Sequence, residues 1–312
     1  MNRTEYQKYA EQYINTLPST KKSDKTILSY SMILKKFGDY LNSLEQDGEI
    51  QPITVVNFRT ELYATEIKSN TIGYYLTVLH TFFEWAIRMK LIEHNPIQRE
   101  EIPRAEQIEY DLLSLDEIKT LLTEIPPRID RKTALRNRAI VILLVQVGLR
   151  NSELRTLPLS ALDFENNCIE IKHGKGDKRR LVAFPSLARQ LVKEYLESDV
   201  RPSNLSPNDY LFGTDADENG HSTNGKVWKA FSSAGLLGLV NRYTRLCCGH
   251  EVGVHALRHA SASLWDNLGI EMRDIQNALG HASISTTEKI YVNILNKSKS
   301  ANSINLAFDG AL

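Results

Sequence analysis

The side chains best suited to chemistry in this sequence are histidines, arginines and a tyrosine within residues 255–291. They are His255, Arg258, His259, His281 and Tyr291. Imidazoles exchange protons near neutral pH, and a guanidinium group binds two phosphate oxygens at once. A phenol becomes a nucleophile when a base or a positive field assists it. These residue types suit an attack on a phosphate group that uses no metal ion.

Helical patterns place most of these groups at helix ends or turns, where a ligand can reach them. After His255, apolar residues recur on one helix face as far as Leu268-Gly269, which predicts a helix C-terminus there. A second short helix is expected over residues 271–278 and ends at Gly280, so His281 falls in the turn that follows.

A last short helix is expected to carry Tyr291. Ser285 and Glu288 have the spacing of a capping box that would open it. Residues 296–312 begin with a polar run and end with apolar residues. This tail could pack on its own domain or on a neighbouring molecule.

Other kinds of site have weaker support. The sequence contains no glycine-rich phosphate loop and no dinucleotide-binding fingerprint. Cys247 and Cys248 with His250 suggest zinc, but adjacent cysteines point in different directions and no Cys-x-x-Cys pair supports them. No convincing carboxylate set for two-metal chemistry is visible, although a dispersed set stays open. We therefore expect neither a metal nor a cofactor.

Length and composition indicate a globular protein of two domains. The chain has 312 residues, 42% of them hydrophobic and 24% charged. No apolar run approaches the roughly 18 residues that span a membrane, and the polar N-terminus lacks a signal-peptide core. Three cysteines make no disulfide framework, so we expect a cytoplasmic protein. The net charge of zero weighs mildly against nucleic-acid binding, but residues 171–180 form a basic strip.

Residues 1–103 are expected to form a helical domain. Apolar residues recur with a helical period in four segments, the first closed by Pro18 and the second opened by the N-cap Ser23. Aromatic residues within 74–85 could stack on bases, but their helical spacing favours a hydrophobic core. Residues 104–112 are polar and lack a sustained period, so we assign them to a linker.

A larger domain with helices and a small β-sheet is expected over residues 113–295, opening at a capping box of Ser114 and Glu117. A period of two within residues 168–184 predicts a β-hairpin with a basic turn. The other expected elements are helices at 136–147, 186–196 and 227–239, and a loop over 201–224. The fold class is mainly α with a small β-sheet or hairpin.

Five short motifs together resemble the tyrosine recombinase, or phage integrase, family. In the family's order they are Gly148-Leu149-Arg150 with Glu153, Gly174-Lys175-Gly176, His255-x-x-Arg258-His259, Leu279-Gly280-His281 and Tyr291. The resemblance implies a mixed α+β catalytic domain over residues 113–295. It also implies that residues 1–103 are a SAM-like core-binding domain that clamps DNA.

The resemblance assigns Tyr291 as the nucleophile. Its attack on the scissile phosphate would form a 3′-phosphotyrosyl link and free a 5′-hydroxyl. Lys175 would donate a proton to the leaving 5′-oxygen, and His255 would accept or organise the tyrosine proton. Lys172 and Lys178 compete with Lys175 for this role.

The resemblance also assigns the residues that hold the phosphate. Arg150 and Arg258 would bind its oxygens, His281 would donate to them, and Glu153 would orient the site. His259 is expected to be a structural helix residue. The DNA-backbone contacts are expected from Lys172, Lys178, Arg179 and Arg180.

The implied function is site-specific recombination of double-stranded DNA by a homotetramer on two sites, without a cofactor and without a membrane partner. Integration, excision and the resolution of cointegrates or dimers are all open, and accessory proteins could take part. We expect a nucleoid-associated protein whose residues 296–312 are exchanged between protomers. The alternatives are DNA relaxation by a type IB topoisomerase-like enzyme and a catalytically silent DNA-binding regulator of the same fold.

Overall fold

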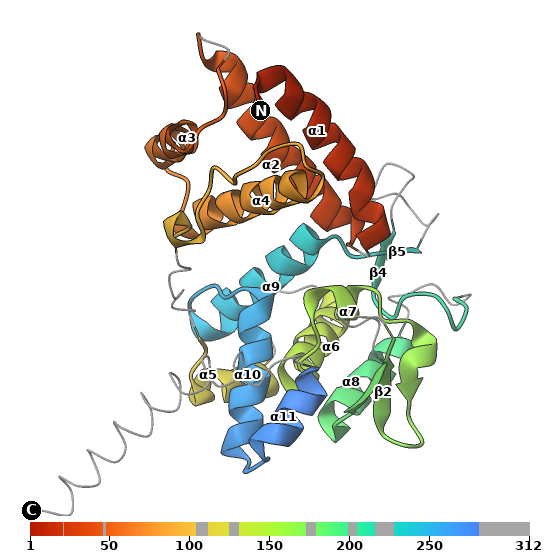
Figure 1. Ribbon diagram of the computed structural model, residues 1–312. Helices are drawn as coiled ribbons and strands as arrows, with labels where there is room; N and C mark the ends of the chain where they lie inside the picture. The colour runs from red at the N-terminus through yellow and green to blue at the C-terminus, as the bar shows by residue number, and fades with distance from the viewer. Residues whose placement is uncertain are drawn as a thin grey trace, which may run out of the picture. The chain divides into compact units, whose positions relative to one another are not determined.

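A computed structural model describes residues 1–20, 22–45, 48–103, 112–124, 131–172, 179–198, 205–215 and 228–280. The chain forms two compact units, Met1–Glu109 and Tyr110–Leu312 (Figure 1). The boundary between them falls within the segment that the sequence assigns to a linker. No helix in these described ranges combines the length and the apolar character needed to cross a membrane.

The first unit is helical, as expected. Side-chain caps open its first two helices: the Asn2 side chain and Glu5 form a capping box, and the Ser23 side chain accepts the Thr26 N–H. Lys68 is the N-cap of the fourth helix, without a side-chain cap hydrogen bond. The elements are α1 (Arg3–Thr16), a 3₁₀ turn (Leu17–Thr20), α2 (Asp24–Ser43), α3 (Pro52–Ala64), α4 (Ser69–Arg88) and a 3₁₀ turn (Arg99–Glu101).

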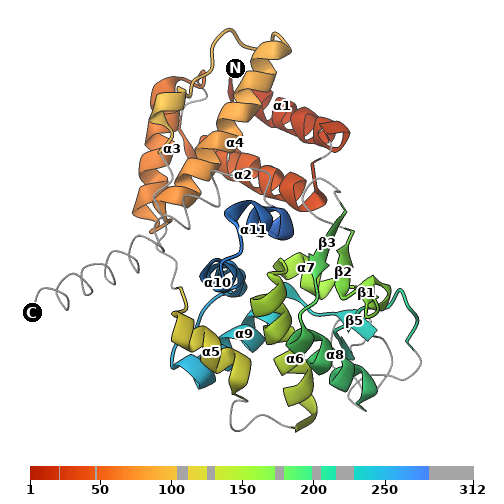
Figure 2. The ribbon, with the colours of Figure 1, turned by 90° about the horizontal axis from the view of Figure 1, so that it is seen from below.

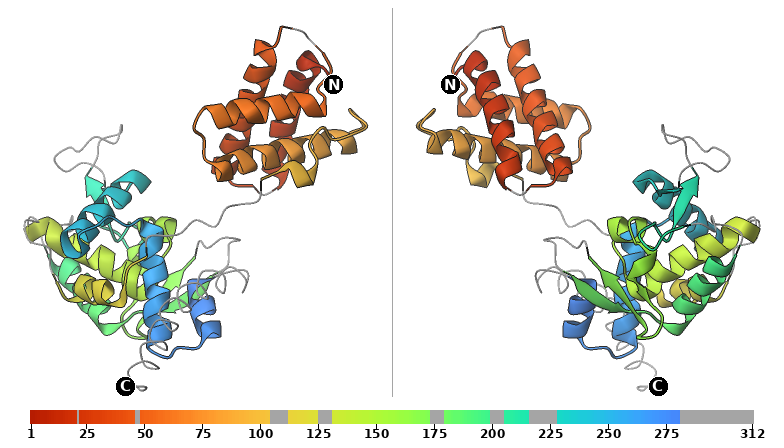
Figure 3. Two further views of the ribbon diagram at one scale, coloured as in Figure 1. Left: turned by 90° about the vertical axis from the view of Figure 1, so that its left-hand side faces the viewer. Right: turned by 90° about the vertical axis from the view of Figure 1, so that its right-hand side faces the viewer.

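Helices α1, α2 and α4 pack against one another (Figures 2 and 3). Aromatic rings from these helices form the centre of the hydrophobic core of this unit. The Tyr6 ring meets Phe37 and Phe82 edge-on, with centroids 5.2 and 5.3 Å away, and its hydroxyl donates to the Leu34 carbonyl. The expectation that the aromatic series of α4 is core holds for Phe82, which is fully buried. It is wrong for Tyr74, which lies on the surface.

In its described residues, the second unit combines helices with two small antiparallel sheets, in the strand orders β1-β2-β3 and β4-β5. Its first helix opens at the expected capping box of Ser114 and Glu117. The elements are α5 (Leu115–Thr123), α6 (Arg131–Val147), α7 (Asn151–Arg155), a 3₁₀ turn (Leu159–Ala161), β1 (Leu162–Asp163), β2 (Cys168–Ile171), β3 (Arg180–Ala183), α8 (Ser186–Glu197), β4 (Gly213–Asp215), β5 (Trp228–Ala230), α9 (Ser233–Cys248), α10 (Val254–Asn267) and α11 (Met272–Leu279).

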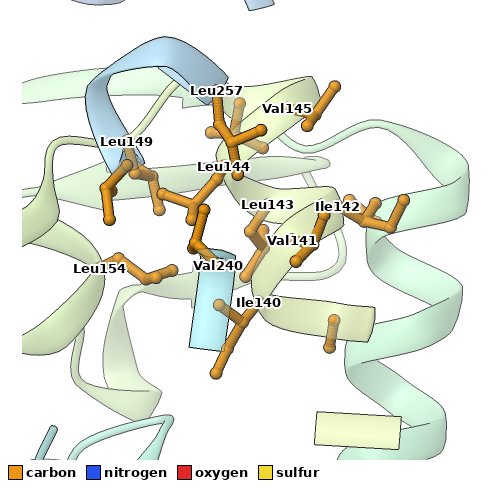
Figure 4. Close-up of a cluster of buried hydrophobic side chains, with 14 of the residues drawn as sticks. Ile140, Val141, Ile142, Leu143, Leu144, Val145, Leu149, Leu154, Val240 and Leu257 are labelled. Atoms are coloured by element: carbon orange, nitrogen blue, oxygen red, sulfur yellow. The ribbon is translucent and has the colours of Figure 1, made fainter. Parts of the chain in front are cut away.

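Helix α6 is the centre of the second core. Its residues from Ile140 to Val145 are all fully buried, so apolar side chains leave it in every direction. The helix packs against α8 and α10. Figure 4 shows Leu149, Leu154, Val240 and Leu257 around it. The chain segment that leaves α6 therefore starts within the hydrophobic core.

The hairpin predicted within residues 168–184 is present as β2 and β3. Ile169 faces Val182 in the pairing, and both are buried, whereas Leu181 on the other face is 67% exposed. The helix expected over residues 227–239 is only partly correct. Residues 228–230 form β5, because they pair with β4 and the Trp228 indole N–H donates to the Tyr210 carbonyl.

Candidate active site

Arg150 lies at the junction between α6 and α7. Gly148 ends α6 with a φ of +67°, and Arg150 is the N-cap of α7. Glu153 reaches back three residues: its carboxylate accepts the Arg150 N–H at 2.8 Å and the Arg150 Nη1 at 2.7 Å. The spacing Arg150-x-x-Glu153 is thus the spacing of a helix cap.

Glu153 is a buried carboxylate shared by two arginines. It is 4% exposed, and the Nη1 and Nη2 of Arg180 each donate to one of its oxygens at 2.8 Å. Burial alone would raise the pKa of Glu153. The hydrogen bonds from Arg180, with those from Arg150 and the charge of Arg180, lower it to about 2. The side chain is therefore a carboxylate at neutral pH.

Three arginines from three elements converge on the last turn of α11. Arg180 on β3 donates from Nε to the Ala278 carbonyl at 3.0 Å, and Arg150 donates from Nη2 to the Gly280 carbonyl at 2.6 Å. Arg258 on α10 is buried and donates to the Leu279 and Gly148 carbonyls. The last carbonyls of a helix lack intrahelical donors and carry the negative end of its dipole, so they attract guanidinium groups.

The expected phosphate ligands Arg150 and Arg258 are therefore brought together, although 108 positions separate them. Both hold the helix end that immediately precedes His281. His281, Tyr291, Lys175 and Lys178 lie outside the described residues.

The two histidines of α10 differ in their surroundings. His255 is exposed in the first turn of α10, and its pKa is lowered by partial desolvation and by the charges of Arg258 and Arg150. His259 is more enclosed, and burial, His255 and Arg258 lower its pKa to about 4. A neutral imidazole at position 255 is able to accept a proton.

The expected DNA contacts divide into two groups. Lys172 and Arg179 flank the hairpin turn, their side chains are 41% and 75% exposed, and both lie near Glu170 at 3.2 and 3.7 Å. Arg180 differs from the expectation of a surface contact. Its side chain is 12% exposed and its guanidinium faces Glu153. The strand alternation explains this, because Arg180 shares a face with the buried Val182.

The cysteines suggested for zinc make protein contacts instead. The Cys248 thiol donates to the Glu117 carbonyl, and His250 Nε2 lies 2.7 Å from a Glu117 carboxylate oxygen. Burial, with nearby carboxylates, raises the pKa of Cys247 to about 11 and that of Cys248 to about 12, which disfavours the thiolate that zinc binds. Among the described side chains, no three His, Cys, Asp or Glu form a group that could hold a metal ion.

Comparisons with known proteins give matches to phage integrases for both units. Residues 111–298 match the phage integrase family, and residues 10–90 match the N-terminal SAM-like domain of phage integrases. Tyrosine recombinase XerC of Staphylococcus aureus (strain bovine RF122 / ET3-1) is 28% identical over 290 residues, which cover 92% of each chain. XerC of Lactobacillus delbrueckii subsp. bulgaricus is 29% identical over 295 residues, which cover 91% of this chain and 93% of the relative.

Solved structures of similar fold include recombinases bound to DNA. XerH on a palindromic difH substrate, in a post-cleavage complex, has a TM-score of 0.71 and 26% identity, covering 88% of this chain and 79% of that chain. The Tn1549 transposon integrase with circular intermediate DNA has a TM-score of 0.69 and 20% identity, covering 93% and 95%, and supports the fold. The matched family region takes in the helix cap at Arg150, the hairpin and α10 with α11. The chain belongs to the phage integrase family of tyrosine recombinases.

Proposed function

We propose that this protein is a site-specific DNA recombinase that cuts and rejoins strands without a metal ion. The observation that supports this most is the convergence of Arg150 and Arg258 on one end of α11. Two guanidinium groups held this way can neutralise the charge that spreads over phosphate oxygens in the transition state. The residue that follows in the chain, His281, belongs to the same site.

In the proposed reaction, the Tyr291 oxygen bonds to the scissile phosphorus and the bond from phosphorus to the 5′-oxygen breaks. His255 takes the phenol proton, and Lys175 gives a proton to the leaving 5′-oxygen. The 3′-phosphotyrosyl link conserves the energy of the broken bond. A 5′-hydroxyl of another strand can therefore reverse the step without ATP.

The assembly proposed for strand exchange is a homotetramer on two DNA sites, with residues 296–312 exchanged between protomers. Strand exchange is favoured over relaxation of DNA because an apolar tail after a polar hinge suits docking on a neighbour. The relatives named XerC and XerH are recombinases, and the XerH complex contains a difH substrate. Lys172 and Arg179, on the exposed side of the hairpin, are proposed to contact the DNA backbone.

The test is a suicide-substrate assay in a chelator. A duplex selected from random sequences for tight binding is nicked beside each phosphate in turn, so that cleavage releases a short strand and traps the adduct. We expect a protein–DNA adduct that survives denaturing electrophoresis in the wild type. It should be absent in Tyr291→Phe and present in Tyr63→Phe, which makes the same change at an exposed tyrosine of the first unit.

An adduct in Tyr291→Phe, or an adduct that needs Mg²⁺, would contradict the proposed mechanism. Exchange is then separated from relaxation by supplying two labelled duplexes with the wild-type protein. A recombinase joins the label of one duplex to the other. A topoisomerase-like enzyme rejoins only the original strands.

A further inference from the structure

All three guanidinium nitrogens of Arg180 donate hydrogen bonds to other groups of the protein. Nη1 and Nη2 each hold one oxygen of the Glu153 carboxylate at 2.8 Å, and Nε holds the Ala278 carbonyl at 3.0 Å. The side chain also covers the end of α11, where a Cβ added to Gly280 would lie 3.2 Å from Arg180 Cδ. These contacts leave the Arg180 guanidinium group facing the interior of the second unit and away from solvent.

The carboxylate that Arg180 holds is the same one that holds Arg150. One Glu153 oxygen accepts from the Nη1 atoms of both arginines, at 2.7 Å and 2.8 Å. A bidentate guanidinium fixes the plane of a carboxylate, whereas a lysine ammonium holds only a point. The orientation of the Arg150 guanidinium therefore depends on Arg180 through Glu153.

Arg180 also connects the hairpin to this site. It is the first residue of β3, which follows Lys175 in the sequence, and it is anchored to the same helix end that Arg150 and Arg258 hold. Three parts of the proposed site thus meet at one side chain: the hairpin, the Arg150 cap and the last turn of α11.

We propose that Arg180 is a positioning residue for strand cleavage, which acts through Glu153 and the Ala278 carbonyl and makes no DNA contact. This inference rests on the proposed recombinase function. It gives Arg180 a different role from its exposed neighbour Arg179. Removing Arg180 should slow the covalent step and leave the affinity for DNA unchanged.

The first test compares Arg180→Lys with Arg179→Ala and Lys193→Ala. Single-turnover cleavage is measured at saturating nicked DNA, and affinity is measured by fluorescence anisotropy over a range of salt. We expect Arg180→Lys to cleave on the order of 100-fold more slowly, the scale expected for a misplaced catalytic group. Arg180→Gln, which removes the charge, should keep the wild-type slope of log K against log[salt].

The controls separate a positioning role from a phosphate contact. Arg179→Ala, at the exposed position, should reduce the salt slope by about 1. Lys193→Ala removes an exposed charge on α8 and should change neither measurement. The proposal is overturned if Arg180→Lys cleaves at the wild-type rate, or if Arg180→Gln loses salt slope as Arg179→Ala does.

A second measurement excludes simple loss of structure. In a cycle of Arg180→Gln, Glu153→Gln and the double variant, the double variant should cleave no more slowly than Glu153→Gln, because both changes break the same link. Removing Arg180 also raises the pKa of Glu153, so Arg180→Gln should lose activity at a higher pH than the wild type as the solution is acidified. The proposal would be overturned if the losses in cleavage rate from the two single changes multiply in the double variant and Arg180→Gln loses activity at the same acidic pH as the wild type.

The wild-type adduct distinguishes this inference from the proposed function. If the wild type forms the Tyr291 adduct and Arg180→Lys matches it, only the role of Arg180 is wrong. If the wild type forms no adduct, the proposed function fails, and the role of Arg180 fails with it.

Discussion

Glu153 is the residue on which the geometry of the candidate site depends. A buried carboxylate without partners would be strongly unfavourable, and here four donors from Arg150 and Arg180 compensate its burial. Removing one member of such a group leaves the others buried with unpaired charge. Arg150, which is proposed to bind phosphate, is therefore only as well oriented as the Glu153 carboxylate that it contacts.

Acidic pH should lower the free energy of unfolding of the second unit, because Glu153 becomes protonated. Its pKa is about 2 in the folded protein, against an ordinary value of 4.5. A carboxyl group whose pKa is lowered by folding contributes stability above its unfolded pKa and loses it as the pH falls through the folded pKa. We expect a loss of about 3 kcal/mol in the free energy of unfolding between about pH 4.5 and pH 2.

Urea denaturation over this pH range checks the expectation. Other carboxyl groups also titrate there, so the informative quantity is the difference between the wild type and Glu153→Gln. That difference should shrink as the pH falls. Glu165→Gln, at an exposed position before β2, serves as the matched control and should follow the wild type. Parallel curves for the wild type and Glu153→Gln would show that the carboxylate makes no such contribution.

Residue identities at the site were easier to predict than residue roles. Arg150, Glu153 and Arg258 are visible in the sequence because they stand in short motifs. The inward direction of Arg180 was missed because its place in a run of basic residues suggests a surface. The alternation of β3 contains the needed signal, since Val182 is apolar and two residues away. The carbonyl groups of residues 278–280 have no signal in side-chain identity at all.

Gly148 is the point where α6, α10 and α11 meet. Its φ of +67° is accessible to glycine at little cost, and its carbonyl accepts from Arg258. A Cβ there would lie 2.8 Å from Leu279 Cδ2 and 3.3 Å from the Ser261 side chain. The small residue therefore serves both the backbone turn and the packing of two other helices.

Gly148→Ala should destabilise the second unit more than Gly249→Ala. Both glycines have a positive φ, but a Cβ at Gly249 would meet nothing within 4 Å. Gly249→Ala should therefore cost only the left-handed backbone strain, about 1–2 kcal/mol. Gly148→Ala adds overpacking of about 1–3 kcal/mol, and urea unfolding of the two variants measures the difference. Equal losses would mean that Leu279 and Ser261 move aside without cost.

The helices and the hairpin of β2 and β3 were predicted well, and strand β5 was not. A helix is set by local spacing and caps, as at Ser23 and Ser114. Strand β5 depends on a distant partner: Asp215 pairs with Trp228, and Gly213 allows the Trp228 ring to lie so close that a Cβ would be 2.5 Å from it. The apolar spacing of residues 227–239 fits a helix when this pairing is ignored.

The molecule as a whole consists of two units with separate hydrophobic cores, one centred on Phe37 and Phe82 and the other on α6. The net charge of zero gave little guidance to the function, because phosphate binding depends on where cations lie. The exposed Lys172 and Arg179, which are proposed to contact the DNA backbone, are an example of such local cations. The family comparisons cover both units.

Residues 1–103 and 112–312 should fold separately and share the DNA-binding energy. Each fragment has its own core, so each should unfold cooperatively in urea.

If both units neutralise phosphates, the slope of log K against log[salt] for the full chain should equal about the sum of the slopes for the fragments. The linked chain should also bind more tightly than either fragment, because the linker raises the effective concentration of the second unit. Anisotropy titrations of the three proteins over a range of salt measure both effects. A fragment 112–312 with the full slope would show that residues 1–103 make no phosphate contacts.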